Sequence, residues 1–65
     1  MTFAEKVKYV RGKLLLSQEA LAKEVGVSYP TINRWENGHK PTWVLECKFN
    51  NYCQNKKINF MEWDK

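Results

Sequence analysis

The chain has 65 residues, 43% of them hydrophobic, and a formal charge of +4. A chain this short forms one domain, which we place over residues 1–65, and its small core often gains stability from a partner chain. No apolar run reaches transmembrane length and no signal peptide is evident, so we expect a cytoplasmic protein. Residues 1–40 carry seven Lys and Arg against four Glu. This excess suits a polyanionic partner, although charge alone fits an ordinary solvated surface equally well.

The two cysteines do not indicate a disulfide or a metal site. Cys47 and Cys53 are six residues apart, which on one helix is a rise of ~9 Å with side chains about 120° apart. That geometry does not fit a disulfide within the chain. A metal site that added His39 would lack a fourth ligand and the usual spacing. We therefore expect no metal, no cofactor, and buried, reduced thiols.

A first helix is predicted to begin at Thr2. Thr2 and Glu5 have the spacing of a capping box. One apolar stripe follows at helical intervals, formed by Phe3, Val7, Val10 and Leu14. Gly12 weakens a helix, so we expect its end to fray near Lys13. The apolar residues 14–16 then form a connector that we expect to be buried.

Residues 18–35 contain two short amphipathic segments joined by a glycine. Ser17 is a good N-cap for the first segment, and Leu21 and Val25 share one face of it. Ala22 is small at the point where a second helix would cross closely. Gly26 can adopt a positive φ and so ends this helix near Val25.

The second segment is predicted to run from about Tyr29 to Asn37. Ser28 is a good N-cap, but Pro30 disfavours helical angles at the residue before it, so either Ser28 or Tyr29 can be the cap. Ile32 and Trp35 give the segment a buried face, and Val27 would fill the corner between the two helices. Two helices, a glycine corner and an apolar plug together describe a helix-turn-helix.

A last helix is predicted to begin after Thr42. Its buried stripe consists of Leu45, Phe49, Tyr52 and Cys53. In the tail, residues 56–65, Asn59 and Glu62 repeat the capping-box spacing, so this segment is either a short fifth helix or an extended tail. The fold class is therefore an all-α bundle of four helices, or five if the tail is helical.

The stretch SQEALAKEVGVSYPTINRWENGHKPT, residues 17–42, resembles the Cro/repressor-type (lambda-repressor-like) helix-turn-helix DNA-binding family. The resemblance covers about residues 11–42 and is strongest over the motif at 17–38. It rests on the Ser-Gln opening, the Leu-Ala pair, the glycine turn and the Glu-Asn-Gly ending before a proline. The resemblance implies that the helix after Ser28 lies in the major groove of duplex DNA.

The resemblance also implies roles for individual residues. The predicted base-reading residues are Ser28, Tyr29, Pro30, Asn33 and Arg34. Arg34 can contact two guanine acceptors, and Asn33 can pair with adenine in two-point fashion. The predicted phosphate contacts are Ser17, Gln18, Thr31, Asn37, His39, Lys40, Thr42 and Trp43. By resemblance, Gln18 alternatively supports a reading residue beside it, and Arg11 and Glu36 form an ion pair under the DNA-facing surface.

The residues and the resemblance together indicate a prokaryotic or phage transcription regulator of repressor type, and not an enzyme. We expect it to bind the nucleoid as a weak homodimer, through the last helix and the apolar tail residues Phe60, Met61 and Trp63. No small-molecule ligand is expected. The alternative is a protein-binding module, such as an antitoxin or antirepressor, that keeps the fold and acts through a protein partner.

Overall fold

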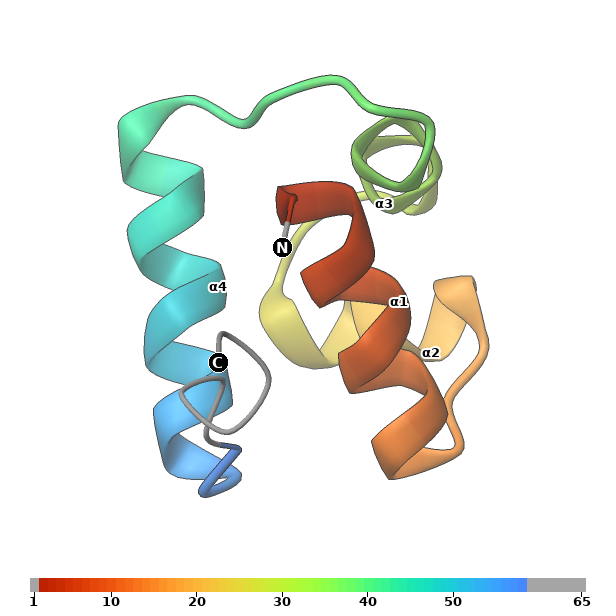
Figure 1. Ribbon diagram of the computed structural model, residues 1–65, viewed down its shortest axis with the longest axis vertical. Coiled ribbons are helices and arrows are strands. Elements are labelled where there is room, and N and C mark those ends of the chain that lie inside the picture. Colours follow the sequence, from red (N-terminus) through yellow and green to blue (C-terminus); the bar gives the residue numbers. More distant parts are fainter. Residues whose placement is uncertain (1, 59–65) are drawn as a thin grey trace.

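The structure, a computed structural model, describes residues 2–58, and within them it contains four helices and no strand. The helices are α1 (Phe3–Leu14), α2 (Gln18–Val25), α3 (Tyr29–Glu36) and α4 (Trp43–Asn55) (Figure 1). The predicted all-α bundle is confirmed. The proposed fifth helix, together with Phe60, Met61 and Trp63, lies outside the described residues.

Three of the four helices begin at a predicted N-cap whose hydroxyl accepts a backbone N–H. Thr2 and Glu5 form the capping box: the Glu5 N–H donates to the Thr2 hydroxyl at 3.2 Å, and the Thr2 N–H donates to the Glu5 carboxylate at 2.7 Å. The hydroxyls of Ser17 and Thr42 likewise accept a backbone N–H three residues ahead. The cap of α3 is Ser28, which decides between the two candidates left open by the sequence.

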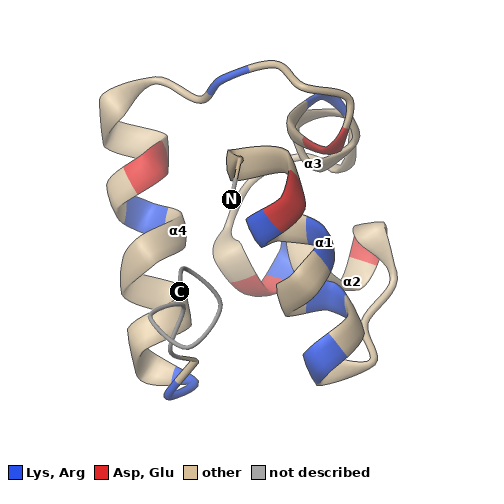
Figure 2. Cartoon of the chain, in the orientation of Figure 1, with Lys and Arg blue, Asp and Glu red and all other residues tan. Residues whose placement is uncertain are grey.

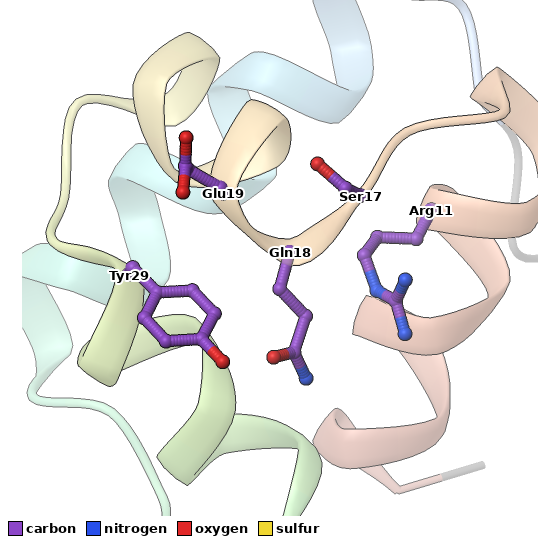
Figure 3. Close-up of a pocket in the computed structure, with 5 residues that line it drawn as sticks. All are labelled: Arg11, Ser17, Gln18, Glu19 and Tyr29. Atoms are coloured by element: carbon purple, nitrogen blue, oxygen red, sulfur yellow. The ribbon is translucent and has the colours of Figure 1, made fainter.

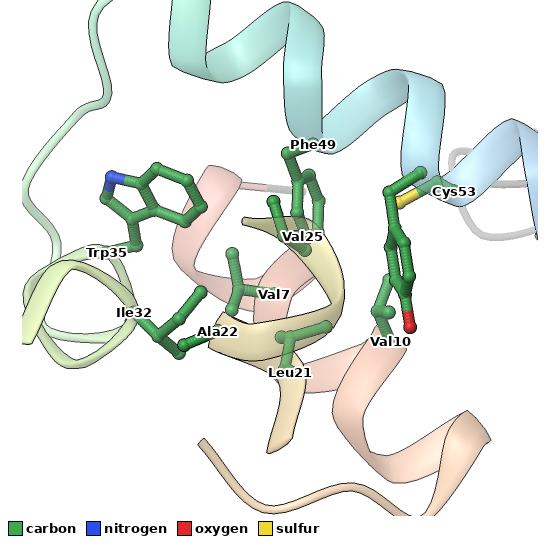
Figure 4. Close-up of a cluster of buried hydrophobic side chains, with 10 residues drawn as sticks. Val7, Val10, Leu21, Ala22, Val25, Ile32, Trp35, Phe49 and Cys53 are labelled. Atoms are coloured by element: carbon green, nitrogen blue, oxygen red, sulfur yellow. The ribbon is translucent and has the colours of Figure 1, made fainter. Parts of the chain in front are cut away.

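All four helices contribute to one core (Figure 4). Its buried members are Val7, Val10, Leu21, Ala22, Val25, Ile32, Trp35, Phe49, Tyr52 and Cys53. Three aromatic rings join α1, α3 and α4 edge to face: Phe3 lies 5.2 Å from both Trp35 and Phe49, and those two lie 5.9 Å apart. Helix α3 packs on α1 and α2, and α4 packs on α2. The predicted helical stripes are therefore the faces that meet.

The corner between α2 and α3 has the predicted form. Gly26 adopts a φ of 92°, and Val27 packs against the core. A methyl group at position 26 would also meet the Lys48 side chain at 3.3 Å. Lys48 reaches this corner from α4 and donates a hydrogen bond from Nζ to the carbonyl of Gly26 at 3.3 Å. A cation thus lies at the C-terminal end of α2, where the helix dipole favours it.

Two expectations about burial are wrong. Residues 14–16 are not uniformly buried, because Leu15 has the left-handed φ of 56° that ends α1, and its side chain is 90% exposed. Only its neighbours Leu14 and Leu16 pack against the core. Cys47 is half-buried and outside the core, whereas Cys53 is buried. Six residues are not a whole number of helical turns, so the two thiols cannot share one face of α4.

None of the helices within residues 2–58 has the length and apolar character needed to cross a membrane.

Leu15 combines an exposed apolar side chain with a backbone conformation that costs a leucine roughly 1–2 kcal/mol. Asparagine tolerates this conformation better. We therefore expect Leu15→Asn to raise the free energy of unfolding by about 0.5–1 kcal/mol, measured by chemical denaturation. Leu16→Asn is the matched control and should destabilise the domain, because Leu16 packs against the core. Equal effects at the two positions would contradict this interpretation.

Candidate nucleic-acid interface

Helix α3 has one buried face and one exposed face. Ile32, Trp35 and Glu36 are the buried residues of this helix. The five predicted base-reading residues are all exposed: Ser28, Tyr29, Pro30, Asn33 and Arg34. Arg34 makes no side-chain hydrogen bond or ion pair within residues 2–58. The exposed face of α3 therefore offers polar groups and one uncommitted guanidinium to a partner.

Two hydrogen bonds connect side chains along the exposed part of α3. The hydroxyls of Ser28 and Thr31 lie 2.8 Å apart. One turn further on, the amide Nδ2 of Asn37 donates to the side-chain oxygen of Asn33 at 2.7 Å. Thr31 and Asn37, expected at phosphates, are thus each bonded to a predicted base-reading residue. These bonds restrict the side chains before any partner arrives.

A surface hollow lies between α3 and the start of α4. It is lined by Thr31, Arg34, Trp35, His39, Lys40, Pro41, Thr42 and Leu45. Five of these are predicted DNA contacts, and two of them, Arg34 and Lys40, are cations. In Figure 1 the chain from α3 crosses the top of the molecule to α4, and this connection supplies part of the lining of the hollow. Trp43 does not line the hollow and is 76% exposed. The arrangement suits an anionic backbone.

The N-terminus of α2 borders a second, open hollow. It is lined by Arg11, Ser17, Gln18, Glu19 and Tyr29, and Figure 3 shows the Glu19 carboxylate directed away from the Arg11 guanidinium. Ser17 and Gln18, two predicted phosphate contacts, thus lie in the same hollow as the predicted base reader Tyr29. Free backbone N–H groups at a helix N-terminus also favour an anion. The two hollows share no lining residue, and α3 contributes to both of them.

Glu36, at the end of α3, holds three helices together. Arg11 donates from Nε and Nη2 to the two Glu36 carboxylate oxygens at 2.5 and 2.9 Å, which makes the pair bidentate. Gln18 donates from Nε2 to the same carboxylate at 3.1 Å. Burial alone would raise the pKa of Glu36, but the hydrogen bonds from Arg11 and Gln18 and the Arg11 charge outweigh it, so that the pKa is lowered from 4.5. The same carboxylate raises the pKa of Arg11.

Sequence reasoning did not find the bond between Gln18 and Glu36. The available signal was chemical: a buried carboxylate needs several donors, and a bidentate arginine leaves lone pairs unfilled. An amide at the start of α2 is one such donor. Gln18 therefore supports the ion pair, and its amide is partly committed before any phosphate contact.

Within residues 2–58, no group of three or more His, Cys, Asp or Glu side chains could hold a metal ion. Both cysteines are free, and burial raises the pKa of the Cys53 thiol to about 11. The thiol of Cys53 is therefore protonated at neutral pH and packs as an apolar group.

The charged residues are distributed over several elements of the chain. Figure 2 shows Lys and Arg along α1, in the chain before α4 and near the end of α4, with acidic residues between them. Any polyanion that binds must therefore be recognised by local contacts, since the field of the whole molecule is modest.

Two packed helices with a glycine corner, the second exposing a polar face, define a helix-turn-helix DNA-binding domain. A family model described as helix-turn-helix matches residues 7–42, more than half of the chain. The chain belongs to this family, the Cro/C1-type (lambda-repressor-like) helix-turn-helix proteins, as the sequence indicated. This is a family of DNA-binding transcription regulators and not typically of enzymes. Neither the curated proteins nor the solved structures gave a match.

The pair between Arg11 and Glu36 can be tested by a double-mutant cycle. Glu36→Gln or Arg11→Met alone removes one partner and leaves the other charge uncompensated, so each should cost about 3 kcal/mol. This is the lower end of the range for buried pairs because the Arg11 side chain is 29% exposed. The double variant should recover part of the loss. Chemical denaturation measures all four chains, and small, additive effects would show that the two residues do not interact.

The contribution of Glu36 to stability is also expected to depend on pH. Folding lowers the pKa of Glu36. The ionised Glu36 carboxylate therefore contributes all of its stabilisation at pH values above its ordinary pKa of 4.5, and this stabilisation is lost as the pH falls through the pKa of the folded state. The difference in unfolding free energy between the wild type and Glu36→Gln should therefore narrow below pH 4.5. A constant difference down to acid pH would contradict the ionic interpretation.

Proposed function

We propose that the protein is a sequence-specific repressor that reads the major groove of duplex DNA with α3. The observation that supports this most is the division of α3 into a buried apolar face and an exposed polar face within a domain of this family. The major groove admits one helix, and base edges there present a distinct donor and acceptor pattern for each base pair. Arg34 and Asn33 carry the side chains that suit guanine and adenine.

Phosphate contacts position this helix in the proposal. The cation Lys40 lines the hollow before α4, and His39 and Thr42 add donors there. The start of α2, with Ser17 and its backbone N–H groups, holds the other phosphate. Trp43 is exposed at the N-terminus of α4 and can pack its ring on the sugar-phosphate backbone. These contacts fix orientation, while the exposed face of α3 supplies discrimination.

In this proposal, the protein represses transcription by occupying its DNA site. A domain that fills the major groove and the adjacent phosphates at a promoter excludes other proteins from that site. The proposed place of action is therefore the nucleoid in the cytoplasm.

Selection from random duplexes tests the proposal directly, and the salt dependence of binding to the selected site completes the test. A DNA-binding protein should enrich a defined site and lose affinity steeply as salt rises. If no site is enriched and retention on heparin or random duplex is independent of salt, the chain is a protein-binding module of the antitoxin or antirepressor kind instead.

Arg34 is the sharpest single test of base reading. Arg34→Ala should cost ~1–3 kcal/mol on the preferred site and relax the preference at one base pair. Arg34→Lys is the matched control, because it keeps the charge and the salt dependence but loses the two-point contact. Affinities for the preferred duplex and its single-base variants separate these effects. If Arg34→Ala weakens every sequence equally, Arg34 contacts only phosphate.

The proposed homodimer is tested on DNA. The predicted dimer contact is α4 with the tail, residues 56–65. Exposed Val44 leaves apolar surface on α4, and a domain of this size buries little area alone. We expect two chains on an operator whose half-sites lie about one helical turn apart, with weak self-association of the free protein. Sedimentation of the complex gives the stoichiometry, and one chain on every high-affinity site would contradict the dimer proposal.

A further inference from the structure

Two exposed asparagines, Asn33 in α3 and Asn37 at its C-cap, are joined by hydrogen bonds of their amides. The Asn37 Nδ2 donates to the backbone carbonyl of Asn33 at 2.9 Å and to its side-chain oxygen at 2.7 Å. The backbone N–H of Asn37 also donates to the carbonyl of Asn33, at 3.1 Å. Asn33 is thus bonded to Asn37 through both its main chain and its side chain.

These bonds fix which atom of each amide points outward. A backbone carbonyl only accepts, so the Asn37 atom beside it must be the nitrogen. That nitrogen has two hydrogens, and both are used, so the Asn33 atom beside it must be the oxygen. Asn37 therefore has no amide hydrogen left for a phosphate and exposes only an acceptor. Asn33 keeps both hydrogens of its own Nδ2 and one lone pair of Oδ1.

We propose that Asn37 is a positioning residue that sets the base specificity of Asn33. This rests on the proposed reading of the major groove by α3. The outward edge of Asn33 presents a donor beside an acceptor, which complements the N7 acceptor and N6 donor of adenine. Turning the amide by 180° exchanges the two atoms and reverses the pattern. Because Asn37 holds the Asn33 amide in one of its two orientations, Asn33 presents its donor and its acceptor to adenine in one fixed order.

This assignment replaces the phosphate contact expected for Asn37 and predicts a different phenotype. Losing a phosphate contact weakens binding to every sequence alike. Losing a positioning residue leaves the phosphates untouched and frees Asn33 to rotate, so only the base pair that Asn33 reads is affected. Ordering one side chain on binding corresponds to roughly 2- to 10-fold in affinity.

The test measures affinities of the full chain for its selected duplex and for every single-base variant of it. The proteins are the wild type, Asn33→Ala, Asn37→Ala and the double variant. Asn37→Asp is added because it keeps the size of the side chain but replaces the donor with an acceptor. Asn51→Ala, at an exposed position on α4, is the matched control. Thermal unfolding checks the fold, and Asn37→Ala keeps the backbone bond that ends α3.

We expect Asn37→Ala and Asn37→Asp to reduce preference at the same base pair as Asn33→Ala, by roughly 2- to 10-fold. The double variant should be no worse than Asn33→Ala. For Asn37→Ala, affinity for random duplex and its salt dependence should be unchanged, whereas the added charge of Asn37→Asp lowers affinity for every duplex in addition. A uniform loss on all sequences, or no loss at all, with Asn37→Ala overturns this inference alone. A wild type with no base preference anywhere overturns the proposed function, and the inference with it.

Discussion

An eight-residue helix is not stable by itself in water, and α3 has eight residues. The exposed face of the molecule therefore exists only because three residues on the other side of α3 are held by the rest of the chain. Ile32 and Trp35 supply apolar area, and Trp35 meets rings from α1 and α4. Glu36 supplies the directional contact. The contacts of Ile32, Trp35 and Glu36 therefore determine where every exposed polar group of α3 lies.

Glu36 brings a requirement of its own. A carboxylate in the last turn of a helix is disfavoured by the dipole, and burial increases the cost. The bidentate bond from Arg11 and the bond from Gln18 offset both terms, and they come from α1 and from the first turn of α2. Hence α3, which is proposed to read bases, and the N-terminus of α2, which is proposed to hold a phosphate, are joined through the Glu36 carboxylate. Their spacing is fixed by hydrogen-bond lengths and not only by apolar packing, which has no direction.

Local chemistry made most of the fold predictable, and tertiary geometry limited the rest. Caps such as Thr2 and the Gly26 corner depend on residues a few positions apart, and the structure has them. The exposure of Leu15 was missed because apolar composition suggested burial, whereas its left-handed backbone turns the side chain outward. Arg11 and Glu36 are 25 residues apart, so the resemblance suggested the pair where spacing could not. The partners of Gln18 depend on how α2 meets α3, which no local pattern encodes.

The exposed groups of α3 differ in how much order they already have. Ser28 with Thr31, and Asn33 with Asn37, are bonded side chain to side chain, so little rotational freedom remains to be lost on binding. Arg34 lies between them with its guanidinium uncommitted and a long stem that must be ordered by the partner. A hydrogen-bonded amide discriminates by geometry, whereas a guanidinium without a partner in the domain can adjust to small differences in how the domain docks on DNA. Pairing the two on one short helix lets the fixed groups define the register and lets Arg34 complete the contact once that register is reached.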